Sequence, residues 1–176
     1  MYVAETGYFQ VRNNMLRLRD NDIRLIFGLQ CGDQPLVMTA GPRPPSDFIQ
    51  RRCGFVTRIS SNLVKTLFLD TVRGTSAKDV EDAVKLLTLH VVVKLFFSAS
   101  GESVSWMFIR IIDKLESMKL YNWTGAIWST LPGLVKEFCR THEKVTGCVV
   151  ILLYFLCEHT TLVEANNPGV FPRFLK

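Results

Sequence analysis

One helical stretch in the middle of the chain constrains the fold most. Thr75 or Ser76 can begin this helix, and acidic residues follow at once, where the helix dipole favours negative charge. Apolar residues then recur at i, i+4, i+7, i+11 and i+15, the spacing of one helical face; they are Val80, Val84, Leu87, Val91 and Leu95. We expect this stripe to face the core. A second set of residues widens this stripe and predicts a central helix that is buried on most sides. The set consists of Ala83, Leu86, His90, Val93 and Phe97.

Helical spacing continues on both sides of this stretch. Residues Ser61 to Val72 form one predicted helix, which Gly74 closes. Another apolar stripe indicates a further helix, and its residues are Val104, Phe108, Ile111, Ile112 and Leu115.

The C-terminal third contains two further predicted helices. Asn122 can cap a helix that begins at Trp123. Pro132 removes a backbone donor inside this helix, so we expect a break or kink near Thr130. The last helix is expected from about Glu143 to Glu158, followed by a turn at residues 166–169.

The N-terminal residues alternate between apolar and polar side chains. Tyr8–Arg12 and Met15–Arg19 read as two strands around an Asn13–Asn14 turn, since asparagine tolerates positive φ. Asp20 then caps a short helix that Gly28 ends.

Together these patterns predict a mainly α, multi-helix globular domain with a small N-terminal β-hairpin. Residues 39–47 contain three prolines within four positions and favour an extended polyproline linker. The expected segments are a hairpin with a short helix over residues 1–38, this linker, and a helical body over residues 48–176. We expect them to fold as one cooperative domain overall.

Composition excludes several classes of protein. The 176 residues are 48% apolar and 21% charged, which is ordinary globular usage and not that of a disordered chain, a collagen or a supercharged arm. Five scattered cysteines are an odd number, which disfavours a closed disulfide framework and indicates a reducing, intracellular compartment. The longest apolar run, Val145–Cys157, has 13 residues, and about 20 are needed to span a membrane. No transmembrane segment is therefore expected.

No motif in the sequence points to catalysis, a metal or a cofactor. Potential metal ligands occur late in the chain, but their spacings do not form two close pairs, so buried structural cysteines are the better interpretation. The sequence has neither a nucleophile elbow nor a phosphate-binding glycine loop. Cys139 and His142 are three residues apart on one predicted helix and leave a hydrolase as a minor alternative. His90 is expected to be a hydrogen-bonded core histidine.

A basic segment near the N-terminus suggests nucleic-acid binding as one possible function. Its arginines could contact phosphates, and they are Arg12, Arg17, Arg19 and Arg24. On the predicted strand Arg17 and Arg19 share a face. The alternative interpretation is the solvated cationic side of an amphipathic hairpin.

Several motifs carry a family resemblance. They are Tyr121–Trp128 with its Asn-Trp helix start, the apolar stretch Gly147–His159, the segment Met15–Leu29 followed by Cys31–Gly32, and the ending Asn166–Arg173 with Phe-Pro-Arg. In these motifs the chain resembles the plant mobile domain and related retroelement-associated proteins of grasses. The sequence departs from that pattern at Pro132–Gly133 and stops where members of the family continue, so we expect a truncated relative.

The resemblance implies a transposon-derived plant protein without established catalytic residues. The leading expectation is a non-enzymatic protein–protein interaction domain that binds an unidentified host protein. Tryptophans are its candidate anchors, with core packing as the alternative; they are Trp106, Trp123 and Trp128.

Two further functions stay open: a toxin or antidote of a selfish gene pair that acts through a protein partner, and nucleic-acid binding by the basic hairpin. A homo-oligomer is also compatible with the sequence. The resemblance favours the nucleus, with the cytoplasm and the mitochondrion as alternatives.

Overall fold

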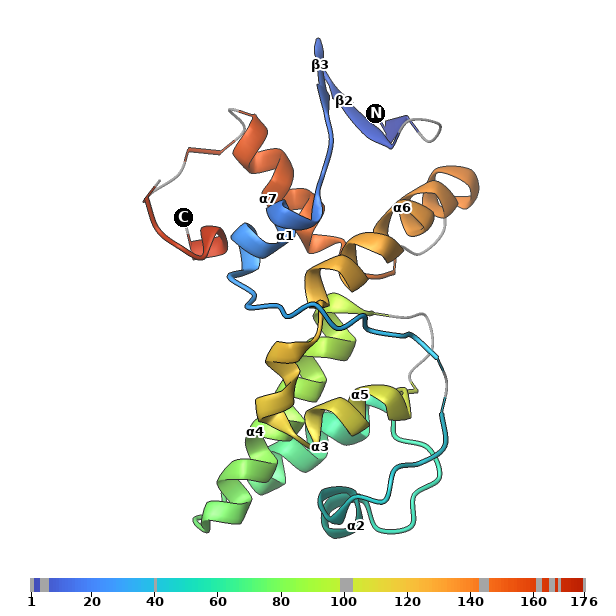
Figure 1. Cartoon of the computed structure of the whole chain (residues 1–176), viewed down its shortest axis with the longest axis vertical. Coiled ribbons are helices and arrows are strands. Elements are labelled where there is room, and N and C mark those ends of the chain that lie inside the picture. The colour runs from blue at the N-terminus through green and yellow to red at the C-terminus, as the bar shows by residue number, and fades with distance from the viewer. Residues whose placement is uncertain are drawn as a thin grey trace. The chain divides into compact units, whose positions relative to one another are not determined.

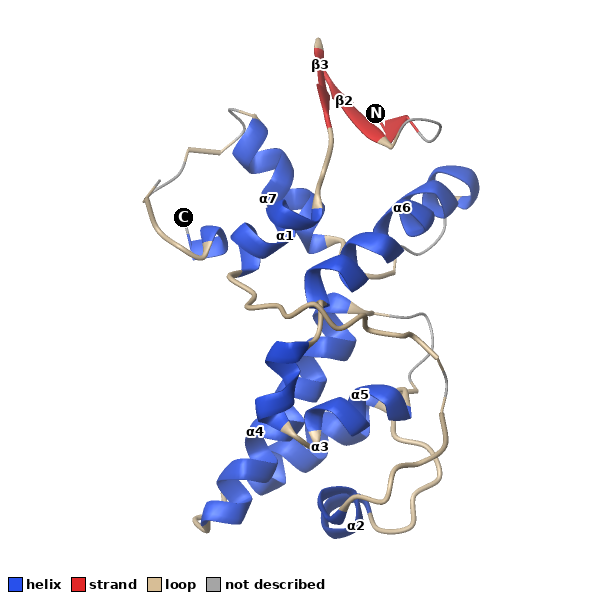
Figure 2. Ribbon diagram, viewed as in Figure 1, coloured by secondary structure: helices blue, strands red, loops and turns tan. Residues whose placement is uncertain are grey.

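The chain folds into helices joined by turns and loops, the longest of which connects α1 (Asp20–Phe27) to α2 (Asp47–Cys53), with a small sheet near the N-terminus (Figures 1 and 2). The computed structural model describes residues 2–3, 7–39, 41–98, 103–142, 146–160, 163–164, 167 and 169–175. The prediction of a mainly α fold with a small N-terminal β element is confirmed. Among the described residues, none of the helices combines the length and the apolar character needed to cross a lipid bilayer.

Backbone contacts group the chain into two compact units. The first unit joins Met1–Leu36 to Tyr121–Lys176, and the second consists of Val37–Leu120. These bounds differ from the expected segments 1–38, 39–47 and 48–176, because residues from both ends of the chain pack together in the first unit. For example, the Asn122 amide donates to the Gln34 carbonyl at 2.7 Å.

The first unit contains a three-stranded antiparallel sheet in the order β1-β2-β3. Its strands are β1 (Tyr2–Val3), β2 (Tyr8–Val11) and β3 (Asn14–Leu16). Val11 pairs with Asn14, so the tight turn consists of Arg12 and Asn13. The predicted Asn13–Asn14 turn is therefore wrong by one residue, and Arg12 takes up the positive φ of 53°.

The short helix α1 (Asp20–Phe27) follows the sheet and has a defined start and end. Its N-cap is Arg19, one residue before the predicted cap, and the Asp22 carboxylate accepts a hydrogen bond from the Arg19 amide at 2.8 Å. Gly28 ends the helix at φ 67°, as predicted. Ile23 and Ile26 are fully buried and fix this helix to the unit.

The long helix α6 (Trp123–Thr141) begins with the predicted Asn122 cap, whose side chain accepts from the Gly125 amide at 2.8 Å. The sequence predicts a break or kink near Thr130, and the break is wrong, because the helix continues through Pro132. Hydroxyl groups of Ser129 and Thr130 donate to carbonyls one turn earlier, and the flanking Leu131 is buried. Burial of Leu131 favours the continuous helix and counteracts the cost of the donor that proline lacks.

The last helix, α7, covers Val150–His159 and is followed by the short 3-10 helix η3 (Arg173–Leu175). The prediction placed its start near Glu143, but residues 146–149 are not helical. Residues 143–145 lie outside the described part of the chain, as do 166 and 168 of the predicted turn. Glu158 pairs with Arg173 at 2.9 Å and holds the C-terminal segment against α7.

The regular secondary structure of the second unit is helical over the residues that the structure describes. It contains α2 (Asp47–Cys53), α3 (Ser61–Thr71), α4 (Ala77–Val91) with its π-helical continuation η1 (Val92–Phe96), α5 (Trp106–Ile112) and the 3-10 helix η2 (Leu115–Leu120). Helices α3 and α4 pack side by side along their length (Figure 1). Ser76 caps α4 through the Asp79 amide, as the sequence predicts.

The apolar stripe of α4 does not face the core. Val80, Val84, Leu87 and Val91 are exposed, with Val80 at 58%. The core contacts instead come from the opposite face, about half a turn away, and the residues buried there are Ala83, Leu86, Leu89, Val92 and Phe96. Helix α4 therefore has two apolar faces, and the second unit covers only one of them.

A buried carboxylate holds α2 against α4. The side chain of Asp82 is fully buried and accepts hydrogen bonds from Arg51 Nη2 at 2.9 Å and Arg52 Nε at 2.8 Å. Arg52 also reaches Asp79 through its Nη2 at 2.5 Å. These bonds raise the pKa values of both arginines, chiefly through Asp82 for Arg51 and Asp79 for Arg52.

A second ionic contact joins α4 to α5. Lys85, whose side chain is 6% exposed, bonds to Glu81 at 2.8 Å and to Asp113 at 3.2 Å. Its ammonium group also lies 5.5 Å from the centre of the Phe48 ring of α2. The buried polar residues Asp82 and Lys85 thus lie on the core side of α4, and their ionic contacts join α4 to α2 and α5.

We predict that Asp82→Ala destabilises the protein by about 3 kcal/mol, because it leaves two arginines without their buried partner. Urea unfolding followed by circular dichroism measures this loss. The control is Glu137→Gln, which removes a solvent-exposed pair with Arg140 and should change little. Equal effects of the two substitutions would contradict the central role of Asp82.

Candidate functional site

An apolar groove runs between α3 and α4 in the second unit. The hollow has a volume of about 260 Å³, and side chains from both helices and their connecting turn form its walls. Phe68 and Val72 contribute from the α3 side, and Val80, Val84 and Leu87 from the α4 side. We refer to this surface as the α3–α4 groove.

Local sequence explains why the groove is open. Helices α3 and α4 are joined by only a short turn, so they run antiparallel and in contact. Ala83, the small residue of the buried face, lines the hollow between larger side chains. The larger side chains of Val80, Val84 and Leu87 form the walls around Ala83.

Exposed aliphatic residues of α3 and α4 line the groove or are next to its lining residues in the sequence. Leu69 and Val72 of the α3 side are 47% and 53% exposed, and Leu87 of α4 is 46% exposed. Single exposed aliphatic residues are normal on a protein surface, whereas a contiguous patch of them marks a contact with another molecule or ligand. The spacing of four, three and four residues along α4 makes this patch a line parallel to the helix.

Asp79 is the acidic residue at the groove wall, and it is already engaged. Its carboxylate accepts from the Ser76 hydroxyl at 2.6 Å and from Arg52. The Ser76 bond and then Arg52 lower the pKa of Asp79 to about 2. The ammonium groups of Lys85 and then Lys78 lower the pKa of Glu81, which is next to Val80, to about 2 as well.

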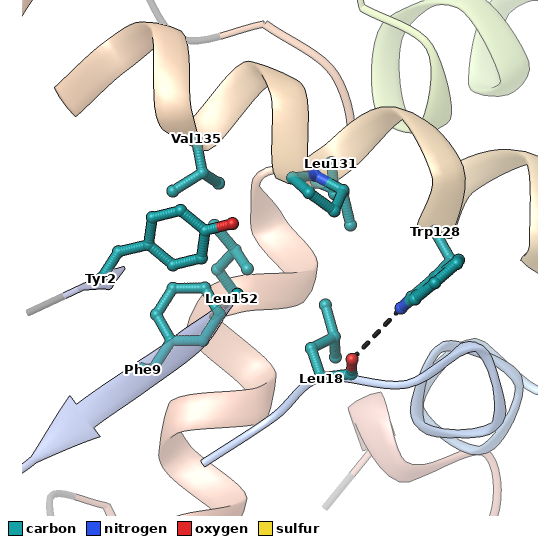
Figure 3. Close-up of a pocket in the computed structure, with 9 residues that line it drawn as sticks. Tyr2, Phe9, Leu18, Trp128, Leu131, Val135 and Leu152 are labelled. Atoms are coloured by element: carbon teal, nitrogen blue, oxygen red, sulfur yellow. Dashed lines mark hydrogen bonds between the residues drawn. The ribbon is translucent and has the colours of Figure 1, made fainter. Parts of the chain in front are cut away.

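The first unit contains a smaller apolar hollow, which Figure 3 shows. Tyr2 and Phe9 from the sheet lie toward Val135 of α6 and Leu152 of α7. The indole of Trp128 lies at the edge and donates to the Leu18 carbonyl at 3.1 Å (Figure 3). The accessible space is about 30 Å³, so the hollow is a packing gap with room for little more than a solvent molecule.

The three predicted tryptophan anchors have different surroundings. Trp123 is 5% exposed and belongs to the core of the first unit, while Trp128 is 37% exposed. Trp106 starts α5 in the second unit and is half-buried, and the guanidinium carbon of Arg43 lies 5.7 Å from its ring centre. None of the three lines the α3–α4 groove. The groove residues were missed because their helical spacing is equally typical of a core.

All four predicted phosphate-contacting arginines are exposed. Arg12 is in the hairpin turn, and Arg17 follows β3 with its guanidinium carbon 5.6 Å from the centre of the Tyr8 ring. Arg19 precedes α1, and Arg24 is in its last turn. Strand β3 ends at Leu16, so the predicted pairing of Arg17 and Arg19 on one strand face is wrong. Among the described residues, none of the four forms an ion pair.

The cysteine and histidine candidates of the C-terminal region all belong to the first unit. No cluster of three potential metal ligands occurs in the described part of the chain. Burial raises the pKa of the Cys148 thiol to about 12, which keeps it protonated. Cys139 is exposed, and the nearby His142 ring stacks toward Phe138 with their centres 6.1 Å apart.

Two buried polar atoms on α3 and α4, Ser61 Oγ and His90 Nδ1, have no hydrogen-bond partner within the described ranges of the chain. The expected hydrogen bond is thus absent at this nitrogen of His90. Neither residue lines the groove.

The fold and the groove define a mainly α protein with an unpartnered apolar surface on one helical hairpin. The chain belongs to the family described as "Domain of unknown function (DUF8566)", whose family model matches residues 2–153. No curated protein and no solved structure matches the chain. The matched stretch includes the whole α3–α4 groove. The family description mentions no activity, and the resemblance to the plant mobile domain stays a prediction.

The depressed pKa values of Asp79 and Glu81 predict a pH dependence of stability. In the unfolded chain these groups titrate near 3.8 and 4.5, and in the folded chain near 2. Unfolding is then coupled to proton uptake, so their contribution is present above about pH 4.5 and is lost as the pH falls toward 2. Urea unfolding between pH 5 and pH 2.5 should show this loss. The double variant Asp79→Asn with Glu81→Gln should have a shallower pH slope; an unchanged slope would contradict the assignment.

Proposed function

We propose that this chain is a non-enzymatic protein-interaction module that binds the apolar surface of a protein partner in the α3–α4 groove. One observation carries the proposal: the regularly spaced aliphatic residues of α4 are exposed along one line, beside exposed aliphatic residues of α3. Exposed apolar surface is unfavourable in water, and burial against a partner recovers about 25 cal/mol for each Å².

The shape of the surface favours a helical segment as the bound element. A groove between two antiparallel helices accepts the apolar side of a third helix, which presents anchors at i, i+3, i+4 and i+7. Aliphatic groove walls supply contact area without requiring polar groups of matching geometry. The resemblance to the plant mobile domain adds a biological setting, in which a transposon-derived plant protein binds a host protein.

Affinity capture with matched variants tests this proposal. The tagged chain is incubated with plant cell extract at high salt and with nuclease, and stoichiometric partners are compared. Val84→Asp and Leu87→Asp place charges on the groove wall and should lower recovery at least tenfold. Because both side chains are exposed, the fold should persist, which circular dichroism checks.

Phe55→Asp is the control for these variants. Phe55 is 92% exposed in the same unit and does not line the groove. Recovery that falls equally in all three variants, or that falls in none, would contradict the groove as the binding surface.

A second candidate function, nucleic-acid binding, is supported by the four exposed arginines around the N-terminal hairpin and α1. Replacing Arg12, Arg17, Arg19 and Arg24 with glutamine should then weaken binding to a labelled duplex. It should also flatten the dependence of affinity on salt, because phosphate contacts release counterions. Gel-shift titrations at two salt concentrations measure both effects. A salt dependence that the quadruple variant keeps in full would exclude this function for the arginines.

A further inference from the structure

We infer that the α3–α4 groove selects an amphipathic partner helix whose apolar face is flanked by acidic residues. This inference rests on the proposed function and adds the charge of the partner. Its basis is the distribution of charged side chains around the groove.

Three basic residues flank the groove-lining segments in the chain: Lys65 is on α3, Arg73 follows α3, and Lys94 is on η1, which continues α4. Lys65 is three, four and seven residues before Phe68, Leu69 and Val72, so it is on the same face of α3. Lys94 follows Val91 by three residues and continues beyond the apolar line of α4, and Arg73 comes directly after Val72. All three basic side chains are exposed.

These cations have no ion-pair partner among the described residues. The acidic groups near them are mostly engaged elsewhere. Asp79 is bound by Ser76 and Arg52, and Glu81 by Lys78 and Lys85. Asp70 is the one exposed carboxylate of α3, and five residues after Lys65 it is on another face of that helix.

The apolar line has the length of a helical ligand. Val80 and Val91 are eleven residues apart, which corresponds to about 16 Å along a helix with a rise of 1.5 Å per residue. A partner helix of three turns covers this distance. Acidic residues beside its apolar face would come close to Lys65 on one side and Lys94 near one end.

The same charges argue against a second copy of this chain as the occupant. Two grooves placed face to face would bring Lys65, Arg73 and Lys94 of each copy against those of the other. Such like-charge contacts oppose association and suppress wrong partners. An acidic helix has no such penalty.

Three synthetic peptides test the inference. All have the same length and the same leucines at i, i+3, i+4 and i+7, and the flanking positions are glutamate, glutamine or lysine. Fluorescence anisotropy of each labelled peptide with the full chain gives the Kd. We expect the glutamate peptide to bind at least tenfold more tightly than the lysine peptide at low salt, and this ratio to shrink as salt rises.

A charge-reversed variant supplies the second measurement. Lys65→Glu combined with Lys94→Glu should remove or invert the preference for the glutamate peptide while the glutamine peptide binds as before. Lys119→Glu is the control, since this exposed lysine is on η2 and does not line the groove. Its peptide preference should equal that of the unsubstituted chain.

The outcomes separate this inference from the proposed function. Equal affinities for the three peptides, all abolished by Leu87→Asp, would overturn the charge selectivity and keep the groove as a protein-binding site. Failure of all three peptides to bind would overturn both. A dimer in sedimentation that Leu87→Asp disrupts would identify a second copy as the occupant and overturn the acidic helix.

Discussion

The second unit depends on the buried carboxylate of Asp82. A single acidic side chain without solvent exposure receives hydrogen bonds from two consecutive arginines of α2. Removing an ionised carboxylate from water is unfavourable, and only partners at hydrogen-bond distance compensate for it. Arg51 and Arg52 must therefore lie against α4, which fixes the position of α2. Lys85, one turn later, fixes α5 in the same way through Asp113. The orientation of α4 about its own axis follows from these two contacts.

That orientation explains the groove. With Asp82, Lys85, Leu86 and Leu89 directed to the interior, the apolar line from Val80 to Val91 is on the other side of the helix. Helix α4 could bury both of its apolar faces only if neighbouring elements covered both. Helix α3 covers part of the face that carries Val80 to Val91. The exposed remainder follows from this arrangement, and the proposed binding function rests on it. The charge preference rests in addition on Lys65, Arg73 and Lys94, which form no ion pair in the part of the chain that the structure describes.

Sequence patterns predicted the positions of helices and caps better than they predicted which side chains are buried. The Ser76 and Asn122 caps and the Gly28 helix end were predicted because local hydrogen bonding and backbone freedom decide them. The break expected near Thr130 was wrong, because the local cost of proline is visible in the sequence whereas the burial of the neighbouring Leu131, which favours a continuous helix, is not. The candidate tryptophans were chosen by residue type, whereas exposure distinguishes Trp128 from Trp123, and exposure depends on what packs above each ring.

The sequence by itself determined the helical class, most helix ends and the existence of an apolar line on α4, since all of these follow from interactions between residues close together in the chain. It could not determine which way that line faces. Two apolar faces of similar strength compete for the interior, and hydrophobic spacing does not rank them. Only the tertiary structure decided which face of α4 is buried, because the partners of Asp82 and Lys85 lie about 30 residues away along the chain. Leaving those buried charges without partners would cost more free energy than leaving four aliphatic side chains exposed.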